Sequence, residues 1–115
     1  MNLPVLLLTI TGRRSGDAHT KALMYLPSDD RFVVMASVLG EPRHPAWWLN
    51  LKANPRAQIE VGARRIPVMA REAEGEERER LWNEIVERQA DYAAYQSRTQ
   101  RRIPVVVLEP LTAGS

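Results

Sequence analysis

The chain has 115 residues and no cysteine, and its mass of 13.1 kDa suits one domain, residues 1–115, with a single core. Hydrophobic residues make up 44% and charged residues 26% of the chain, proportions that exclude a disordered protein. Without cysteine there is no disulfide, thiolate metal site or thiol nucleophile, and with only two histidines no metal is expected. Since there is no apolar run of about eighteen residues, no membrane insertion is expected.

The charges are unevenly distributed along the chain. Fourteen of the sixteen basic residues are arginine, whose planar guanidinium suits phosphates and carboxylates. Eight of the fourteen acidic residues fall between Glu72 and Asp91, where only three arginines occur. The acidic segment and the basic remainder together favour an anionic ligand on the basic part.

The N-terminal part is predicted to form three strands. The first, Leu3–Thr11, is rich in Val, Leu and Ile. A glycine-bracketed basic turn, Gly12–Gly16, follows it. The next two strands, His19–Leu26 and Arg31–Val38, are expected to pair as a hairpin around the turn-forming Pro27–Asp30.

The middle of the chain predicts a helix and a second hairpin. Pro45 occupies a position favoured at a helix start, so a helix is expected over Ala46–Asn54, with Trp47, Trp48 and Leu51 toward the core. Arg56–Val61 and Arg64–Arg71 are predicted as antiparallel partners around Gly62-Ala63.

The C-terminal part predicts two helices and a central strand. Glu72–Arg88 has apolar residues at helical spacing and acids in its first turn. A shorter helix is expected over Tyr92–Ser97, and the continuous apolar run Ile103–Leu108 indicates a central strand. The order predicts a mostly β (α+β) fold, a six-stranded antiparallel barrel with two to three covering helices.

The turn Gly12–Gly16 is the first candidate site. Its glycines allow a tight bend with exposed amides, and Arg13 and Arg14 can hold a phosphate or carboxylate, with His19 close by. It matches neither a Walker A nor a dinucleotide-binding sequence. A solvated basic turn with no ligand is the alternative.

Two further clusters contain groups that could line a site. Ser37 at a strand end and Trp47 and Trp48 at a helix start could border a flat heteroaromatic ring, whereas core packing is the alternative for the tryptophans. Tyr92 and Tyr95 share a helical face and could donate protons, or they could simply pack together.

These segments together resemble the deazaflavin (coenzyme F-420)-dependent nitroreductase family of actinobacteria. The resemblance covers nearly the whole chain and depends on five blocks, which are Leu7–Gly16, Ala36-Ser37, His44–Pro55, Tyr92–Gln96 and Arg102–Pro110. It implies a split β-barrel related to FMN-binding barrels, and coenzyme F-420, an 8-hydroxy-5-deazaflavin with an anionic phosphate and polyglutamate tail.

The resemblance also implies where that coenzyme binds. Arg13, Arg14 and His19 would hold the phosphate and tail, and Leu23 and Met24 would offer backbone groups to the ring edge. Three consecutive residues would line the ring and the ribityl chain: Ala36, Ser37 and Val38.

The remaining implied roles concern the rest of the pocket. Ala46 and Trp47 would close the cofactor site, and Ser37, Tyr92 and Tyr95 would orient or protonate the substrate. The implied activity is hydride transfer from the reduced coenzyme to a small electron-poor acceptor such as a quinone, an activated enone or a nitroaromatic.

Several alternatives stay open from the sequence. The barrel could be a non-catalytic module that stores or carries coenzyme F-420, FMN or an acyl ligand. A nucleic-acid binder, prompted by the pI near 9.4, is disfavoured because a basic strand face with interspersed aromatics is absent. We expect a monomer or homodimer in the cytoplasm, with peripheral contact at the inner membrane face as an option.

Overall fold

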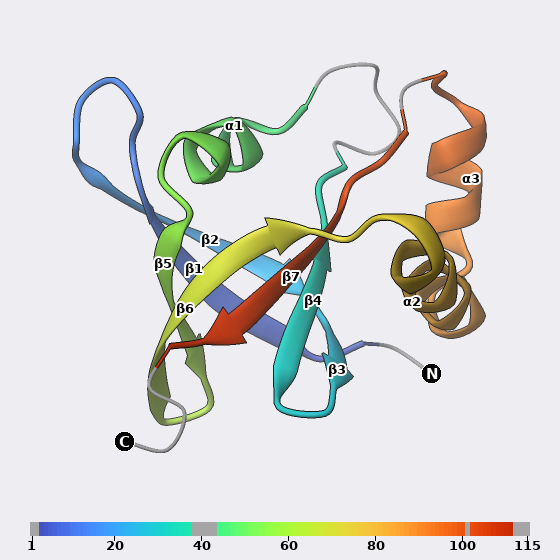
Figure 1. Cartoon of the computed structure of the whole chain (residues 1–115), viewed down its shortest axis with the longest axis horizontal. Coiled ribbons are helices and arrows are strands. Elements are labelled where there is room, and N and C mark those ends of the chain that lie inside the picture. The colour runs from blue at the N-terminus through green and yellow to red at the C-terminus, as the bar shows by residue number, and fades with distance from the viewer. Residues whose placement is uncertain (1–2, 38–43, 101, 112–115) are drawn as a thin grey trace.

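We describe the protein from a computed structural model that defines residues 3–37, 44–100 and 102–111. Within these residues, seven strands form one antiparallel sheet flanked by three helices (Figure 1). The strands are β1 (Val5–Thr11), β2 (Ala18–Met24), β3 (Leu26–Ser28), β4 (Arg31–Met35), β5 (Arg56–Val61), β6 (Arg64–Glu72) and β7 (Val105–Pro110). The helices are α1 (Ala46–Ala53), α2 (Gly75–Arg88) and α3 (Asp91–Ser97).

The sheet curls into an open barrel whose two edges are consecutive in sequence. Its strand order is β2-β1-β5-β6-β7-β4-β3, so β2 and β3 are the edge strands. Only Tyr25 separates them, and its backbone N–H donates to the Pro4 carbonyl at 2.9 Å. The predicted antiparallel split barrel is confirmed, with seven strands in place of six because the chain crosses from one edge to the other at Tyr25.

The predicted hairpin between His19–Leu26 and Arg31–Val38 is wrong over most of its length. β2 instead pairs with β1 along its whole length, from Val5 opposite Met24 to Thr11 opposite Ala18. Only the three residues of β3 pair with β4. The tight Gly12–Gly16 turn brings β2 beside β1, and Pro27 fits the edge strand β3 because it has no N–H to donate.

The apolar side chains form two cores, one on each face of the sheet. The inner core lies within the curled sheet and is covered by α1, which contributes Trp47, Trp48 and Leu51. The outer core lies between the sheet and the pair α2 and α3, which lie side by side (Figure 1). Four consecutive β7 residues, Val105–Leu108, are buried and alternate between these cores, which confirms the predicted central strand.

Helix α2 is amphipathic, as predicted, and is tied to the sheet at its N-terminal end. Leu81 and Ile85 are fully buried, while Arg71 of β6 donates two hydrogen bonds to the Glu77 carboxylate at 2.7 and 2.9 Å. The helix begins at Gly75 rather than at the predicted Glu72, because Glu72 is still paired with β7.

Candidate functional site

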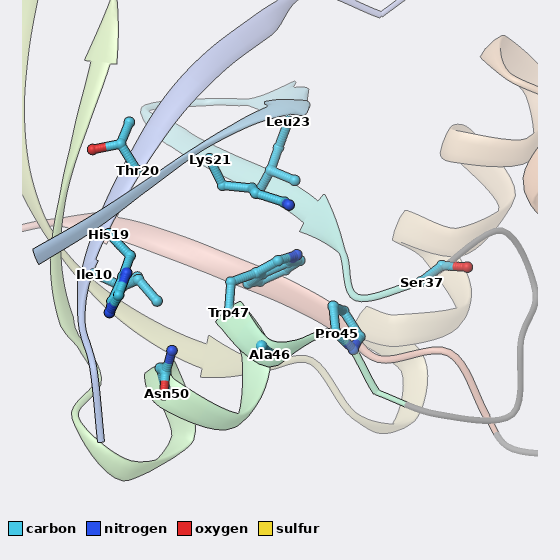
Figure 2. Close-up of a pocket in the computed structure, with 10 residues that line it drawn as sticks. All are labelled: Ile10, His19, Thr20, Lys21, Leu23, Ser37, Pro45, Ala46, Trp47 and Asn50. Atoms are coloured by element: carbon cyan, nitrogen blue, oxygen red, sulfur yellow. The ribbon is translucent and has the colours of Figure 1, made fainter. Parts of the chain in front are cut away.

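A groove of about 650 Å³ opens between the edge strand β2 and helix α1. Figure 2 shows His19 and Asn50 toward one end of it, Ser37 toward the other, and the Trp47 indole between them. None of its ten described lining residues is acidic; they are Ile10, His19, Thr20, Lys21, Leu23, Ser37, Pro45, Ala46, Trp47 and Asn50.

Strand alternation explains the mixed chemistry of the groove wall. Residues two apart on a strand share a face, so His19, Lys21 and Leu23 of β2 all face the same side. Leu23 packs against the inner core, whereas His19 and Lys21 are exposed. The wall therefore changes from apolar to cationic toward the Gly12–Gly16 turn.

Gly12 makes room for the imidazole of His19. A Cβ on residue 12 would stand only 2.9 Å from His19 Nε2 and 2.9 Å from Ser15 Oγ. Real Cβ atoms do not approach other heavy atoms so closely, so a side chain at this position would displace the ring. The glycine that the sequence marks as a turn former also positions the histidine.

Asn50 links the basic turn to helix α1. Its buried Oδ1 accepts a hydrogen bond from the Arg13 backbone N–H at 3.0 Å and another from Arg13 Nη1 at 2.7 Å. With Oδ1 engaged in this way, the amide nitrogen of Asn50 is turned toward His19 (Figure 2). Arg13 is thus held near the His19 end of the groove, although Arg13 is not one of the lining residues.

Helix α1 supplies the floor of the groove. Trp47 and Trp48 are 6% and 4% exposed and contact each other edge to face, with ring centroids 6.5 Å apart. Only Trp47 lines the groove, while Lys52 Nζ lies 5.7 Å from the Trp48 ring. From the sequence, core packing and ring binding were alternatives for the tryptophans. In the structure Trp47 packs in the inner core and also lines the groove.

The other proposed cofactor residues lie around the groove rather than in it. Arg14 is exposed in the turn, and the Met24 side chain packs toward the outer core. Ala36 is fully buried, and its backbone N–H donates to the Pro104 carbonyl at 3.0 Å. Val38 lies outside the described residues.

The tyrosines of α3 are not brought into the groove. Tyr92 and Tyr95 contact each other edge to face, with centroids 5.5 Å apart, and Tyr92 belongs to the outer core. Burial raises the pKa of the Tyr92 hydroxyl above its ordinary value of 10.0, with Tyr95 and Asp91 adding to the effect. Tyr92 is therefore neutral at physiological pH, and the catalytic role of the pair stays a prediction.

Sequence reasoning did not single out Ile10, Thr20, Lys21, Pro45 or Asn50 as site residues. Lys21 could have been found, because it is two residues from both His19 and Leu23 on the same strand. Asn50 carried no local signal, since its partner is 37 positions away.

Neither a metal centre nor a membrane-spanning helix is found among the described residues. They include no group of three or more histidine or acidic side chains placed to hold a metal ion. They also include no helix with the length and hydropathy needed to cross a bilayer.

Comparison with known proteins places the chain in one enzyme class. A sequence profile of the F420H(2)-dependent quinone reductases matches residues 1–110. An F420H(2)-dependent quinone reductase of Mycobacterium tuberculosis is 44% identical over 108 residues, which span 91% of this chain and 72% of that protein.

Two solved structures agree with this assignment. An F420-H2 dependent reductase, FDR-A, superposes with a TM-score of 0.86 and 41% identity, covering 95% of this chain and 96% of the other. A structure described as a domain-swapped dimer matches equally well in TM-score and identity, over 95% of this chain and 82% of the other.

The barrel is therefore that of an oxidoreductase whose cofactor is coenzyme F-420. The chain belongs to the F420H(2)-dependent quinone reductase family. This confirms the resemblance, the enzyme class and the cofactor inferred from the sequence.

Proposed function

We propose that the groove between β2 and α1 binds the deazaflavin ring of coenzyme F-420 and brings a quinone-class acceptor beside it. The observation that supports this most is the composition of the wall. An indole and apolar side chains form one part of it, cationic side chains form another, and no described lining residue is acidic. Coenzyme F-420 matches this wall, because its flat ring suits the apolar part and its anionic tail suits the cationic part.

The size and shape of the groove fit such a ligand. About 650 Å³ is within the range of ordinary small-molecule sites. Trp47, Leu23 and Ile10 would contact the ring, while Lys21 and His19, with Arg13 and Arg14 in the adjacent turn, would hold the phosphate and carboxylates. Ala36 and Val38 remain proposed neighbours of the ring and the ribityl chain.

Backbone groups add to the proposed site. Because β2 is an edge strand, every second residue turns both its backbone N–H and its C=O away from β1. Tyr25 N–H donates to Pro4, so in this register Leu23 pairs with Leu6 while the Met24 backbone groups are available to the ring edge. The first N–H groups of α1, at Ala46 and Trp47, lack helical acceptors and favour negative charge nearby.

When bound, reduced coenzyme F-420 supplies a hydride from C5 to an electron-poor acceptor. The protein orients the two partners, screens them from water with Trp47 and Leu23, and balances the charge of the tail. Ser37 lines the groove and is our candidate for orienting the acceptor. Tyr92 and Tyr95 remain candidates for the proton supply, which a solvent isotope effect on Tyr92→Phe and Tyr95→Phe would test.

The binding test is a fluorescence titration with coenzyme F-420, run in parallel with FMN. We expect Lys21→Ala, and Arg13→Ala combined with Arg14→Ala, each to weaken binding by about tenfold. Arg88→Ala, an exposed arginine on α2, should not change it. Affinity should fall with added salt. Unchanged binding in both groove variants, or preference for FMN, would contradict the proposal.

The activity test is turnover with menadione as the quinone. Oxidation of the reduced coenzyme that depends on menadione would support a quinone acceptor. Tight coenzyme binding without turnover across quinones, enones and nitroaromatics would instead support a carrier module for coenzyme F-420, FMN or an acyl ligand.

We propose a homodimer in the cytoplasm as the working form, although a monomer would bind the coenzyme equally well. Similarity to the domain-swapped dimer supports the dimer. Light scattering at several concentrations tests the oligomeric state, and cell fractionation tests the location, including peripheral membrane contact.

A further inference from the structure

A small cavity of about 200 Å³ lies against helix α2, the helix that packs on the outer core. Its lining consists of Arg78, Glu79, Trp82 and Asn83 of α2, together with Arg102, which precedes β7. It shares no lining residue with the groove. A ligand there would not occupy the coenzyme site.

Arg78 differs from the other two arginines of α2 because it is buried. It is only 9% exposed, and among the described residues its Nη1 atom is buried without a hydrogen-bond partner. Its guanidinium instead lies over the Trp82 ring, with Cζ 5.3 Å from the ring centroid. Buried arginine N–H groups are normally paired, because leaving them unpaired costs free energy.

Burial and a neighbouring positive charge both favour a hydrogen-bond acceptor next to Arg78. Burial lowers the pKa of the Arg78 guanidinium, and the nearby positive charge of Arg102 lowers it further, which outweighs the opposing effect of Glu72. Glu79, on the rim, is exposed. Two arginines thus meet at one cavity, and its acidic lining residue, Glu79, forms no ion pair with Arg78 within the described part of the chain.

We propose that this cavity is an anion subsite that takes a phosphate or carboxylate group of a small soluble molecule. The two guanidiniums would donate hydrogen bonds to the oxyanion, and the Asn83 amide offers a further donor. The indole of Trp82, which also lines the cavity, holds the Arg78 guanidinium in place through a cation–π contact. The volume of about 200 Å³ is large enough for one such group.

The charge of α2 favours a small free anion over a lipid headgroup. Glu79 lines the cavity and is exposed, so an anionic bilayer pressed against this face would meet its negative charge. A single small anion can approach the two guanidiniums without covering that carboxylate with further negative charge.

The test follows the indole N–H resonance of Trp82 in a ¹H–¹⁵N spectrum during titration with inorganic phosphate, without coenzyme. Trp82→Phe identifies the resonance, and sodium chloride at equal ionic strength controls for salt. We expect a saturable shift of the Trp82 signal with phosphate only, while the buried Trp48 serves as an internal reference.

Matched variants make the result specific. Arg78→Met keeps most of the buried stem, and Arg102→Ala changes an exposed residue; each should weaken the phosphate response by about tenfold. Arg88→Ala, on the same helix but away from the cavity, should retain it. No saturable shift of Trp82, or one unchanged in Arg102→Ala, would overturn the proposal.

A vesicle-binding experiment distinguishes a small soluble anion from a lipid headgroup as the source of the phosphate. Phosphatidylcholine vesicles with and without phosphatidic acid are sedimented with the protein. We expect no binding to either. Retention by phosphatidic acid vesicles that requires Arg78 and Arg102 would assign the cavity to a headgroup and overturn the small-molecule assignment. Failure of any of these measurements leaves the coenzyme titration unaffected, since the groove is a separate site.

Discussion

Arg13 and Asn50 connect the basic turn to helix α1 through two hydrogen bonds to one oxygen, Asn50 Oδ1, at 3.0 and 2.7 Å. One bond comes from the backbone and the other from the guanidinium, so the contact orients both the turn and the side chain. The opposite end of the same amide lines the groove (Figure 2). The pair therefore couples the position of a cation to the shape of the proposed coenzyme site.

Asn50→Ala should loosen this coupling. The variant loses two hydrogen bonds whose donor residue, Arg13, is exposed to water, so it should cost about 0.5–1.5 kcal/mol of unfolding free energy. Coenzyme F-420 affinity should fall as well, because the turn is no longer held beside the groove. Urea unfolding and fluorescence titration measure the two effects.

Asn50→Asp is the matched control. The aspartate keeps the acceptor for Arg13, so the protein should stay close to wild type in stability. It also places a negative charge at the groove, so coenzyme binding should still weaken. Equal stability losses in the two variants would contradict the role given to Oδ1.

Gly12→Ala should act through His19. The new Cβ would lie 2.9 Å from the imidazole Nε2, so the ring must move, although both contacted atoms end flexible side chains. We expect a stability change below about 1 kcal/mol and a severalfold loss of coenzyme affinity. The double variant Gly12→Ala with His19→Ala should bind no more weakly than His19→Ala alone, and a further loss would show that the glycine acts independently of the histidine.

Glu77 should make the protein acid-sensitive. The hydrogen bonds from Arg71 hold the pKa of Glu77 below its ordinary value of 4.5, outweighing its burial. The stabilisation is therefore complete above the unfolded-state pKa and is lost as the pH falls through the lowered folded-state value. Glu77→Gln should lose about 1 kcal/mol or less near pH 7 and show a smaller further loss on acidification.

Urea unfolding at several pH values between about 3 and 7 measures this dependence. Glu84→Gln provides the control, because Glu84 forms only a surface pair with Arg80 at 3.7 Å. If both variants respond to acid identically, Glu77 is not the group responsible.

Tyr92 should make the protein sensitive to alkali. Its folded-state pKa is raised above 10.0 by burial first, so the unfolded chain loses this proton at lower pH than the folded one. Stability is then complete below about pH 10 and declines as the pH rises through the folded-state value. Tyr92→Phe should show a smaller decline in unfolding free energy between about pH 9 and 11, and an identical decline would refute the assignment.

Much of the fold could be predicted because its signals are local. The apolar run of β7, the amphipathic pattern of α2 and the glycine-bracketed turn each lie within one segment, and all three appear in the structure. The hairpin error arose at Tyr25, where a continuous β-like pattern gave no sign that the strand divides between two edges of the sheet.

The sequence by itself determined the class of protein, since alternation, helical periodicity and the ordered family blocks are properties of neighbouring residues. Tertiary structure alone decided that Lys21 and Asn50 border the groove while Tyr92 lies in the outer core. It also decided that Arg78 is buried beside Arg102. Such facts depend on contacts between segments distant in the chain, and these form only when the sheet curls and the helices bury their apolar faces.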